Sequence, residues 1–285
     1  MRTVSWLSSA MFILLVNEQA HSLPAAPEES SDKVLRLKAS AETGFLGILD
    51  HKIQQGKSGT YFKYHQEGGQ DVLFPITRFA LDLTRGRHTL VFLYQPLALE
   101  TRATLTRDII VNDVTFTEGT PMRFFYGFPY YRISWLYDLN PKKEVEVAVG
   151  LSFQIRNATI EFQSLDGLQL TSSRNVGPVP ILKFRLRHAA KPVFWWGFEA
   201  DGFYAPISYL NGSDNEVVGA ILDSSLRCGL RVTPSFELFL NLRYLGGGSV
   251  GTSEDTTGLE DGYTRNWIHL LTVTAGFGLT LSPGE

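Results

Sequence analysis

The stretch from Tyr130 to Arg156, YYRISWLYDLNPKKEVEVAVGLSFQIR, sets the pattern that the rest of the chain repeats. From Val145 to Ile155 a large apolar residue stands at every other position, with small or polar residues between them. A period of two is the repeat of a β-strand whose two faces meet different surroundings. The run from Tyr131 to Tyr137 alternates in the same way, and Asn140 to Lys143 separates the two runs. The stretch predicts an antiparallel hairpin.

A strand with one apolar and one polar face fits either a half-buried sheet in water or the wall of a membrane barrel. The aromatic residues of the first run, Tyr131, Trp135 and Tyr137, gather toward the turn. Membrane barrels place aromatic girdles at the ends of their strands, where the wall meets the lipid headgroups. We therefore favour an all-β fold, an antiparallel up-and-down transmembrane β-barrel.

The composition is compatible with this prediction and excludes some other classes. The chain has 285 residues, is 44% hydrophobic and has a formal net charge of -3. After the first two dozen residues it contains no apolar run of the roughly 18 residues that a membrane-spanning helix needs. Without a basic cluster or an excess of positive charge, we expect no nucleic-acid partner. The single cysteine, Cys228, cannot form an internal disulfide.

The N-terminus has the pattern of a secretory signal. Met1-Arg2 is followed by the apolar segment Trp6 to Val16 and then by Ala20-His21-Ser22, which resembles a small-residue cleavage site. We expect residues 1–22 to be a signal peptide and the Pro- and acid-rich residues 23–33 to be a disordered lead-in. Residues 34–285 are then the outer-membrane β-barrel domain.

Short and long connections alternate along that domain, as they do between the two ends of an outer-membrane barrel. We expect about ten strands, at 34–49, 72–83, 88–96, 122–139, 144–156, 179–188, 193–204, 217–232, 236–245 and 267–281. Long loops are expected at 51–71, 97–121, 157–178, 206–216 and 246–266. Strand-like runs inside the second of these loops could add a hairpin, so eight to twelve strands are possible.

The alternation also predicts which residues face the lumen. Val149 should face lipid and Gly150 the lumen, so Gly150→Ser should be milder than Val149→Arg. Charged residues on the lumen side form an expected network of nine cations and seven anions: Arg36, Lys38, Glu42, Arg132, Asp138, Glu146, Lys183, Arg185, Arg187, Glu199, Asp201, Asp223, Arg227, Arg231, Glu237 and Arg243. Near-balanced charges in a narrow, low-dielectric space should pair, because an unpaired buried charge is costly. We expect a plugged lumen.

From residue 34 to its end, the chain resembles the broad superfamily of small outer-membrane β-barrel proteins of Gram-negative bacteria. The resemblance implies localisation in the outer membrane, with the lipid bilayer and the outer-membrane insertion machinery as partners, and a monomer. One feature departs from the superfamily. Its last strand usually ends in an aromatic residue, whereas here Phe277-Gly278-Leu279-Thr280-Leu281 ends in leucine.

The activity is less specified than the fold. Some barrels of this size are omptin proteases, with Asp and His at the outer rim, or lipid A deacylases, with a His and Ser pair. The corresponding candidates here are His51, His65, His269, Glu254, Asp255, Glu260 and Asp261, but no spacing among them fixes a catalytic arrangement. We expect no cofactor and no metal site.

Three functions therefore remain open. The preferred one is an outer-membrane β-barrel with a packed polar lumen and long extracellular loops, in a structural or surface-interaction role. The alternative is a hydrolase at the barrel rim that acts on lipid or peptide. A narrow transport pore is the weaker third possibility.

Overall fold

The computed structural model describes residues 34–140, 144–206, 217–252 and 262–281. The expected signal peptide and lead-in lie outside the described residues. So do Pro141 to Lys143 of the predicted hairpin turn. All described residues belong to one compact unit, Asp32–Glu285.

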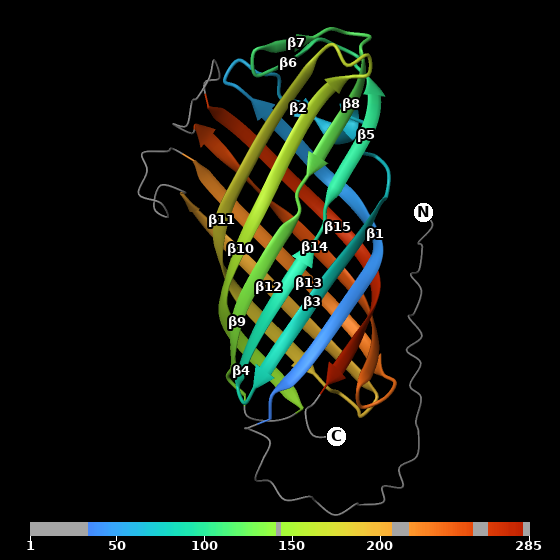
Figure 1. Ribbon diagram of the computed structural model, residues 1–285, viewed down its shortest axis with the longest axis vertical. Coiled ribbons are helices and arrows are strands. Elements are labelled where there is room, and N and C mark those ends of the chain that lie inside the picture. Colours follow the sequence, from blue (N-terminus) through green and yellow to red (C-terminus); the bar gives the residue numbers. More distant parts are fainter. Residues whose placement is uncertain (1–33, 141–143, 207–216, 253–261, 282–285) are drawn as a thin grey trace, which may run out of the picture. The chain divides into compact units, whose positions relative to one another are not determined.

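Within the described residues, ten strands close a barrel (Figure 1). In their order around the barrel they are β1 (Arg36–Gln55), β3 (Phe74–Arg85), β4 (His88–Gln95), β9 (Tyr130–Asp138), β10 (Val145–Ser164), β11 (Leu170–His188), β12 (Phe194–Pro206), β13 (Val218–Arg231), β14 (Phe236–Thr252) and β15 (Tyr263–Leu281). Each strand pairs with the next in antiparallel register, and β15 returns to β1 through the pairs Leu37–Leu281 to Gln55–Thr264. The predicted fold class and the strand count of ten are confirmed.

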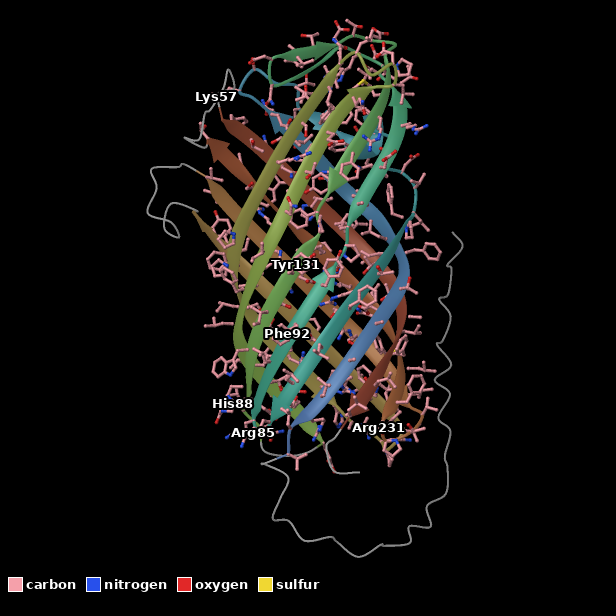
Figure 2. All side chains as sticks on the ribbon, in the orientation of Figure 1. Lys57, Arg85, His88, Phe92, Tyr131 and Arg231 are labelled. Atoms are coloured by element: carbon pink, nitrogen blue, oxygen red, sulfur yellow. The ribbon has the colours of Figure 1, made fainter. Side chains whose placement is uncertain are left out.

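The two ends of the barrel differ. Short connections join β3 to β4, β9 to β10, β11 to β12 and β13 to β14 at one end, which we call the turn end. Figure 2 shows Arg85, His88 and Arg231 there, Lys57 at the opposite or loop end, and Phe92 and Tyr131 between them. At the turn end, Asp138 Oδ1 accepts hydrogen bonds from the backbone N–H groups of Asn140 and Val147 and so shapes the predicted turn.

The loop end contains further strands. Beyond Pro96 and Pro129, β5 (Ala98–Thr104) and β8 (Pro121–Gly127) continue the lines of β4 and β9 and pair with each other. A separate hairpin of β6 (Ile109–Val111) and β7 (Val114–Phe116) lies there, as do β2 (Phe62–Lys63), paired with β1, and the short helix α1 (Tyr64–Glu67). The strand-like runs between 97 and 121 therefore do not add strands to the barrel wall.

The strands extend farther than the sequence pattern predicted. The predicted loop at 157–178 is mostly strand, because β10 continues to Ser164 and β11 begins at Leu170. The predicted loop at 246–266 likewise contains the end of β14, up to Thr252, and the start of β15. Both loop predictions were wrong in their boundaries.

The boundaries differ because the surroundings of the long strands change from lipid to water along their length. β10 shows this change most clearly. Its outward face is apolar from Val145 to Ile155 and then becomes polar with Asn157, Thr159, Glu161 and Gln163. Its inward face changes in the opposite sense, from Ser152 and Gln154 to the buried Ala158, Ile160 and Phe162. The first part is built as a membrane wall and the second as the wall of a water-soluble barrel.

In β1 the interior is already apolar at Leu46 and Ile48, and a register shift follows between Ile48 and Asp50. A β-bulge of this kind adds one residue to the strand and so moves the following side chains to the other face. Beyond it, His51, Ile53 and Gln55 are buried in the interior, while Asp50 and Lys52 form an ion pair of 2.6 Å on the outside.

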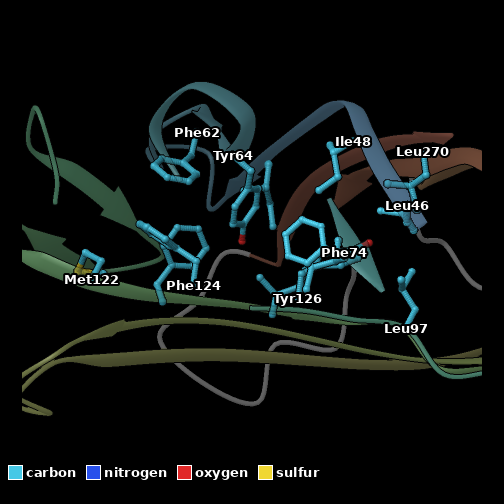
Figure 3. Close-up of a cluster of buried hydrophobic side chains, with 14 of the residues drawn as sticks. Leu46, Ile48, Phe62, Tyr64, Phe74, Leu97, Met122, Phe124, Tyr126 and Leu270 are labelled. Atoms are coloured by element: carbon cyan, nitrogen blue, oxygen red, sulfur yellow. The ribbon is translucent and has the colours of Figure 1, made fainter. Parts of the chain in front are cut away.

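Within the loop end lies an apolar core (Figure 3). Phe62 and Tyr64 pack against Phe124 of β8 and Phe162 of β10, with ring centroids 5.1–6.0 Å apart. Leu46 and Ile48 of β1 and Leu270 of β15 belong to the same cluster. Burial of these large side chains in the interior holds the segment that contains β2 and α1 inside the loop end.

The outward face of the barrel wall is a belt of exposed apolar side chains. The belt includes Phe45, Phe79, Phe92, Ile133, Leu151, Phe153, Leu182, Phe194, Leu226, Leu240, Val273 and Phe277, which together come from all ten strands of the wall. A continuous exposed apolar surface on a closed barrel with a polar interior requires lipid around it. Among the described residues, no helix is both long and apolar enough to cross a membrane.

Two predictions about single residues depend on this face assignment. Val149 is 42% exposed on the outside, as expected. Gly150 faces inward, but a Cβ atom there would collide with the carbonyl oxygen of Trp135 on β9. Gly150→Ser, expected to be milder than Val149→Arg, should therefore also be destabilising, because the neighbouring backbone leaves no room for a side chain.

Candidate functional site

The lumen is crossed by a network of charged side chains, and its central layer joins opposite strands. Arg132 of β9 lies 3.0 Å from Asp201 of β12 and 3.0 Å from Asp223 of β13. Arg243 of β14 binds both carboxylate oxygens of Asp223, at 2.5 and 2.9 Å, and donates to Tyr130 Oη at 2.6 Å. All five side chains are almost completely buried. Because β9 and β13 or β14 face each other across the ring, these contacts bridge the full width of the lumen.

A second layer lies closer to the turn end. Lys183 of β11 contacts Asp201 at 2.8 Å and Glu199 at 2.9 Å, and so links this layer to the first. Arg185, the next inward residue of β11, reaches Asp82 of β3 at 3.0 Å. Glu42 of β1 forms ion pairs with Arg78 at 3.3 Å and Arg227 at 3.7 Å. It also accepts a hydrogen bond of 2.9 Å from the side-chain amide of Asn241.

A third layer lies at the turn end itself. Glu237 of β14 accepts hydrogen bonds from Lys38 at 2.5 Å and from Arg187 at 2.7 Å. The guanidinium of Arg187 also lies over the indole ring of the buried Trp195, 4.1 Å from its centroid. Cation–π contact and ion pairing together fix these side chains across the lumen.

Most of the charged residues expected in the lumen meet in these layers. Ion pairs join Lys38, Glu42, Arg132, Glu146, Lys183, Arg185, Arg187, Glu199, Asp201, Asp223, Arg227, Glu237 and Arg243. Three others lie at the turn end outside the network. Asp138 binds the turn, Arg231 donates to the carbonyl oxygen of Pro192 at 3.2 Å, and Arg36 is exposed without an ion pair to any described residue.

Sequence reasoning missed two charged members, Arg78 and Asp82 of β3. They stand four positions apart on the inward face of a strand whose other face carries Phe79, Leu81 and Leu83, so the alternation could have assigned them. It also missed the neutral side chains that complete the central layer. Gln154 accepts from Arg132 at 2.7 and 2.9 Å, and Gln95 accepts from Arg243 at 2.8 Å. Nothing in the sequence distinguishes such amides from surface ones.

The histidines proposed for a rim active site lie apart from one another. His51 is buried in the loop-end interior, stacked on Tyr64 at 4.2 Å, with Nδ1 2.7 Å from Gln70 Oε1. Burial lowers the pKa of His51 to about 4, so the ring is neutral at pH 7. His65 Nδ1 lies 3.4 Å from the carbonyl oxygen of Gln70. On the outer face, His269 Nδ1 lies 2.6 Å from Tyr244 Oη, as a residue of the interfacial girdle would.

Among the described residues, none of these histidines pairs with a carboxylate, and no group of three His, Cys, Asp or Glu side chains could hold a metal ion. Glu254, Asp255, Glu260 and Asp261 lie outside the described residues. The structure therefore does not bring His51, His65 and His269 together with one another or with a described carboxylate.

Comparisons with known proteins gave similarities to solved structures alone. No family model matches the chain, and no curated protein matches it in sequence. Among solved structures, the outer membrane protease OmpT from Escherichia coli has 13% identity and a TM-score of 0.47, over 88% of this chain and 98% of that one. The attachment invasion locus protein Ail of Yersinia pestis has 8% identity and a TM-score of 0.32, over 86% and 98% of the two chains.

A third similar structure is the toluene transporter TodX of P. putida, with 8% identity and a TM-score of 0.31, over 90% of this chain and 91% of that one. A protease, an attachment protein and a transporter have different activities, so the similarity concerns the fold alone. The closed ring of strands and the lipid-facing belt of this chain are by themselves those of a transmembrane β-barrel.

Proposed function

We propose that the protein is a non-conducting outer-membrane barrel that holds a rigid platform outside the membrane and acts through the surface of that platform. The platform consists of β5, β8, the β6–β7 hairpin and the parts of β10 and β11 beyond the apolar belt. The observation that supports the proposal is the blocked lumen. Charge layers fill the membrane-spanning part, and the apolar core fills the interior of the loop end.

Both barriers oppose conduction. The paired side chains of Arg132, Asp223 and Arg243 extend across the lumen at the central layer and would obstruct an ion there. Farther on, an ion would have to cross an interior lined by Phe62, Phe124 and their neighbours, where a charge is strongly unfavourable. A selective pore would instead need an open path lined by groups that replace the hydration shell of the ion.

The outer face of the platform is suited to water and to contact with other molecules. Arg123 of β8 lies 2.8 Å from Glu100 of β5 and 3.2 Å from Glu161 of β10, so a charged cluster spans three adjacent strands. The hydrogen bond from Arg123 lowers the pKa of Glu100 and keeps it ionised. Exposed polar side chains on a rigid sheet form a preorganised surface for recognition.

Conductance measurements test the first half of the proposal. Purified protein inserted in planar bilayers should give no stable single-channel current, whereas a general porin in the same bilayers should conduct. Reproducible conductance steps from the purified protein would refute the blocked lumen and favour the transport pore.

Labelling of intact cells tests the second half. In a Cys228→Ala background, which removes the free thiol on the outer face, Glu100→Cys should react with a membrane-impermeant maleimide. Arg85→Cys at the turn end is the matched control and should react only after the outer membrane is permeabilised. Labelling of Arg85→Cys alone in intact cells would reverse the proposed orientation.

A further inference from the structure

A cavity of about 50 Å³ lies among the charge layers, lined by Arg132 of the central layer and by residues of the second and third layers. Seven Lys and Arg side chains line it, and only three carboxylates do, those of Asp82, Glu199 and Glu237. The other carboxylates of the network, such as Glu42 and Asp201, hold the same cations from outside the cavity. The space itself is therefore surrounded mainly by positive charge.

The lining residues also have hydrogen-bond donors that lack acceptors. The indole N–H of Trp195 and the Nε–H groups of Arg78 and Arg227 are buried and have no hydrogen-bond partner among the described residues. Every unpartnered buried polar atom of the cavity lining is an N–H donor. A buried donor without an acceptor lowers the stability of the folded state. A ligand that accepts several hydrogen bonds and donates none would therefore suit this lining best.

The charge balance points in the same direction. The ion-paired network of described residues contains eight cations and seven carboxylates. The cations are Lys38, Arg78, Arg132, Lys183, Arg185, Arg187, Arg227 and Arg243, and the carboxylates are Glu42, Asp82, Glu146, Glu199, Asp201, Asp223 and Glu237. With all of these groups ionised, one positive charge is left over. A single monovalent anion would neutralise it at the place where the unpartnered donors gather.

We propose that this cavity binds one small monovalent inorganic anion, with a halide such as chloride as its ligand. The volume has room for about three or four water molecules, hence for one halide ion with part of its hydration shell. Arg78, Arg227 and Trp195 would donate to it from β3, β13 and β12, so the anion would tie three strands together across the lumen.

Diffraction from crystals of the full-length mature protein grown in sodium bromide tests the site directly. An anomalous peak in the cavity between Arg78, Arg227 and Trp195 supports the proposal. Absence of a peak there, or peaks on the outer surface only, overturns it. A second set of crystals grown in sulfate separates the halide from a tetrahedral oxyanion. Sulfate density in the cavity without a bromide peak would overturn the assignment of a monovalent ligand.

Thermal unfolding in detergent provides an independent solution test. At constant ionic strength, replacing gluconate by chloride should raise the unfolding midpoint by about 3–6 °C once chloride reaches about ten times its dissociation constant. Trp195→Phe keeps the ring under Arg187 but removes the indole donor, and should at least halve this rise.

Trp135→Phe is the matched control for that variant. It removes an indole N–H that donates to His88 on the outer face of the wall, and Trp135 is not among the residues that line the cavity, so the chloride effect should be unchanged. If chloride and gluconate give the same midpoint for the wild-type protein, the proposal is refuted whether or not the variants fold. Equal loss of the chloride effect in both variants would also refute it.

Discussion

Placing an arginine at Leu151 should destabilise the protein strongly, because this residue lies near the middle of the lipid-facing part of β10. Outward apolar residues run from Val145 to Ile155, about ten residue steps of roughly 3.4 Å, which at a tilt of about 40° cover about 26 Å along the membrane normal. That length matches the apolar band of roughly 25 Å in such barrels. Leu151 is 59% exposed near its centre. Leu151→Arg should therefore cost about 2–4 kcal/mol.

Asn157→Arg is the matched control on the same face of the same strand. It lies six steps farther along β10, about 16 Å along the membrane normal, where the outer face is already polar. The cost should be about 0–1 kcal/mol. Equilibrium unfolding in lipid vesicles, followed by tryptophan fluorescence, measures both values. Equal costs for the two variants, or a larger cost for Asn157→Arg, would refute the change of solvent that we infer along this strand.

Three further predictions concern the interior. Asp223→Ala leaves Arg132 and Arg243 without their shared carboxylate and should lower the unfolding free energy by about 3–5 kcal/mol in the same vesicle assay; a loss below 1 kcal/mol would contradict the network. Because His51 has its pKa lowered from 6.5 to about 4, the unfolded state binds its proton more tightly, so stability should fall by about 3 kcal/mol as pH drops from 7 to 4. His51→Gln should remove that part of the pH dependence, and an unchanged unfolding profile against pH would refute the burial of a neutral ring. Phe124→Ala in the loop-end core should cost about 3–5 kcal/mol and increase proteolysis of the platform, while the membrane-spanning part remains protected; unchanged proteolysis would contradict the packed core.

The sequence predicted the membrane-spanning parts of the strands and failed beyond them. From Val145 to Ile155 the outside is lipid and the inside is polar, so the period of two has one meaning throughout. After Arg156 the period continues, but the apolar residues Ile160 and Phe162 face inward. If apolar residues are taken to face lipid along the whole strand, the apolar face changes side after Arg156. The pattern then predicts a loop in place of the observed strand. The bulge in β1 hides the same change by moving the alternation by one residue.

The candidate site was predictable in its charges and unpredictable in its pairs. Alternation alone places Lys183 and Arg185 on the inward face of β11, because Leu182 and Phe184 need lipid. Lys183 and Asp201 stand directly opposite each other in the β11–β12 hairpin. Asp82, in contrast, lies 103 residues from Arg185 along the chain, and only the closed ring brings these two side chains within 3.0 Å. Arg78 was within reach of the pattern, since the alternation of its predicted strand also places it on the inward face.

What the sequence by itself determined was therefore the fold class, the ten strands and the faces of their membrane-spanning parts. The physical reason is that lipid and a narrow lumen demand opposite side chains at alternate positions of every strand. The tertiary structure decided which charges meet, how far the strands extend and what fills the interior. Those outcomes depend on which strands stand opposite each other in the closed ring, as Arg132 and Asp223 do, and no local pattern contains that information.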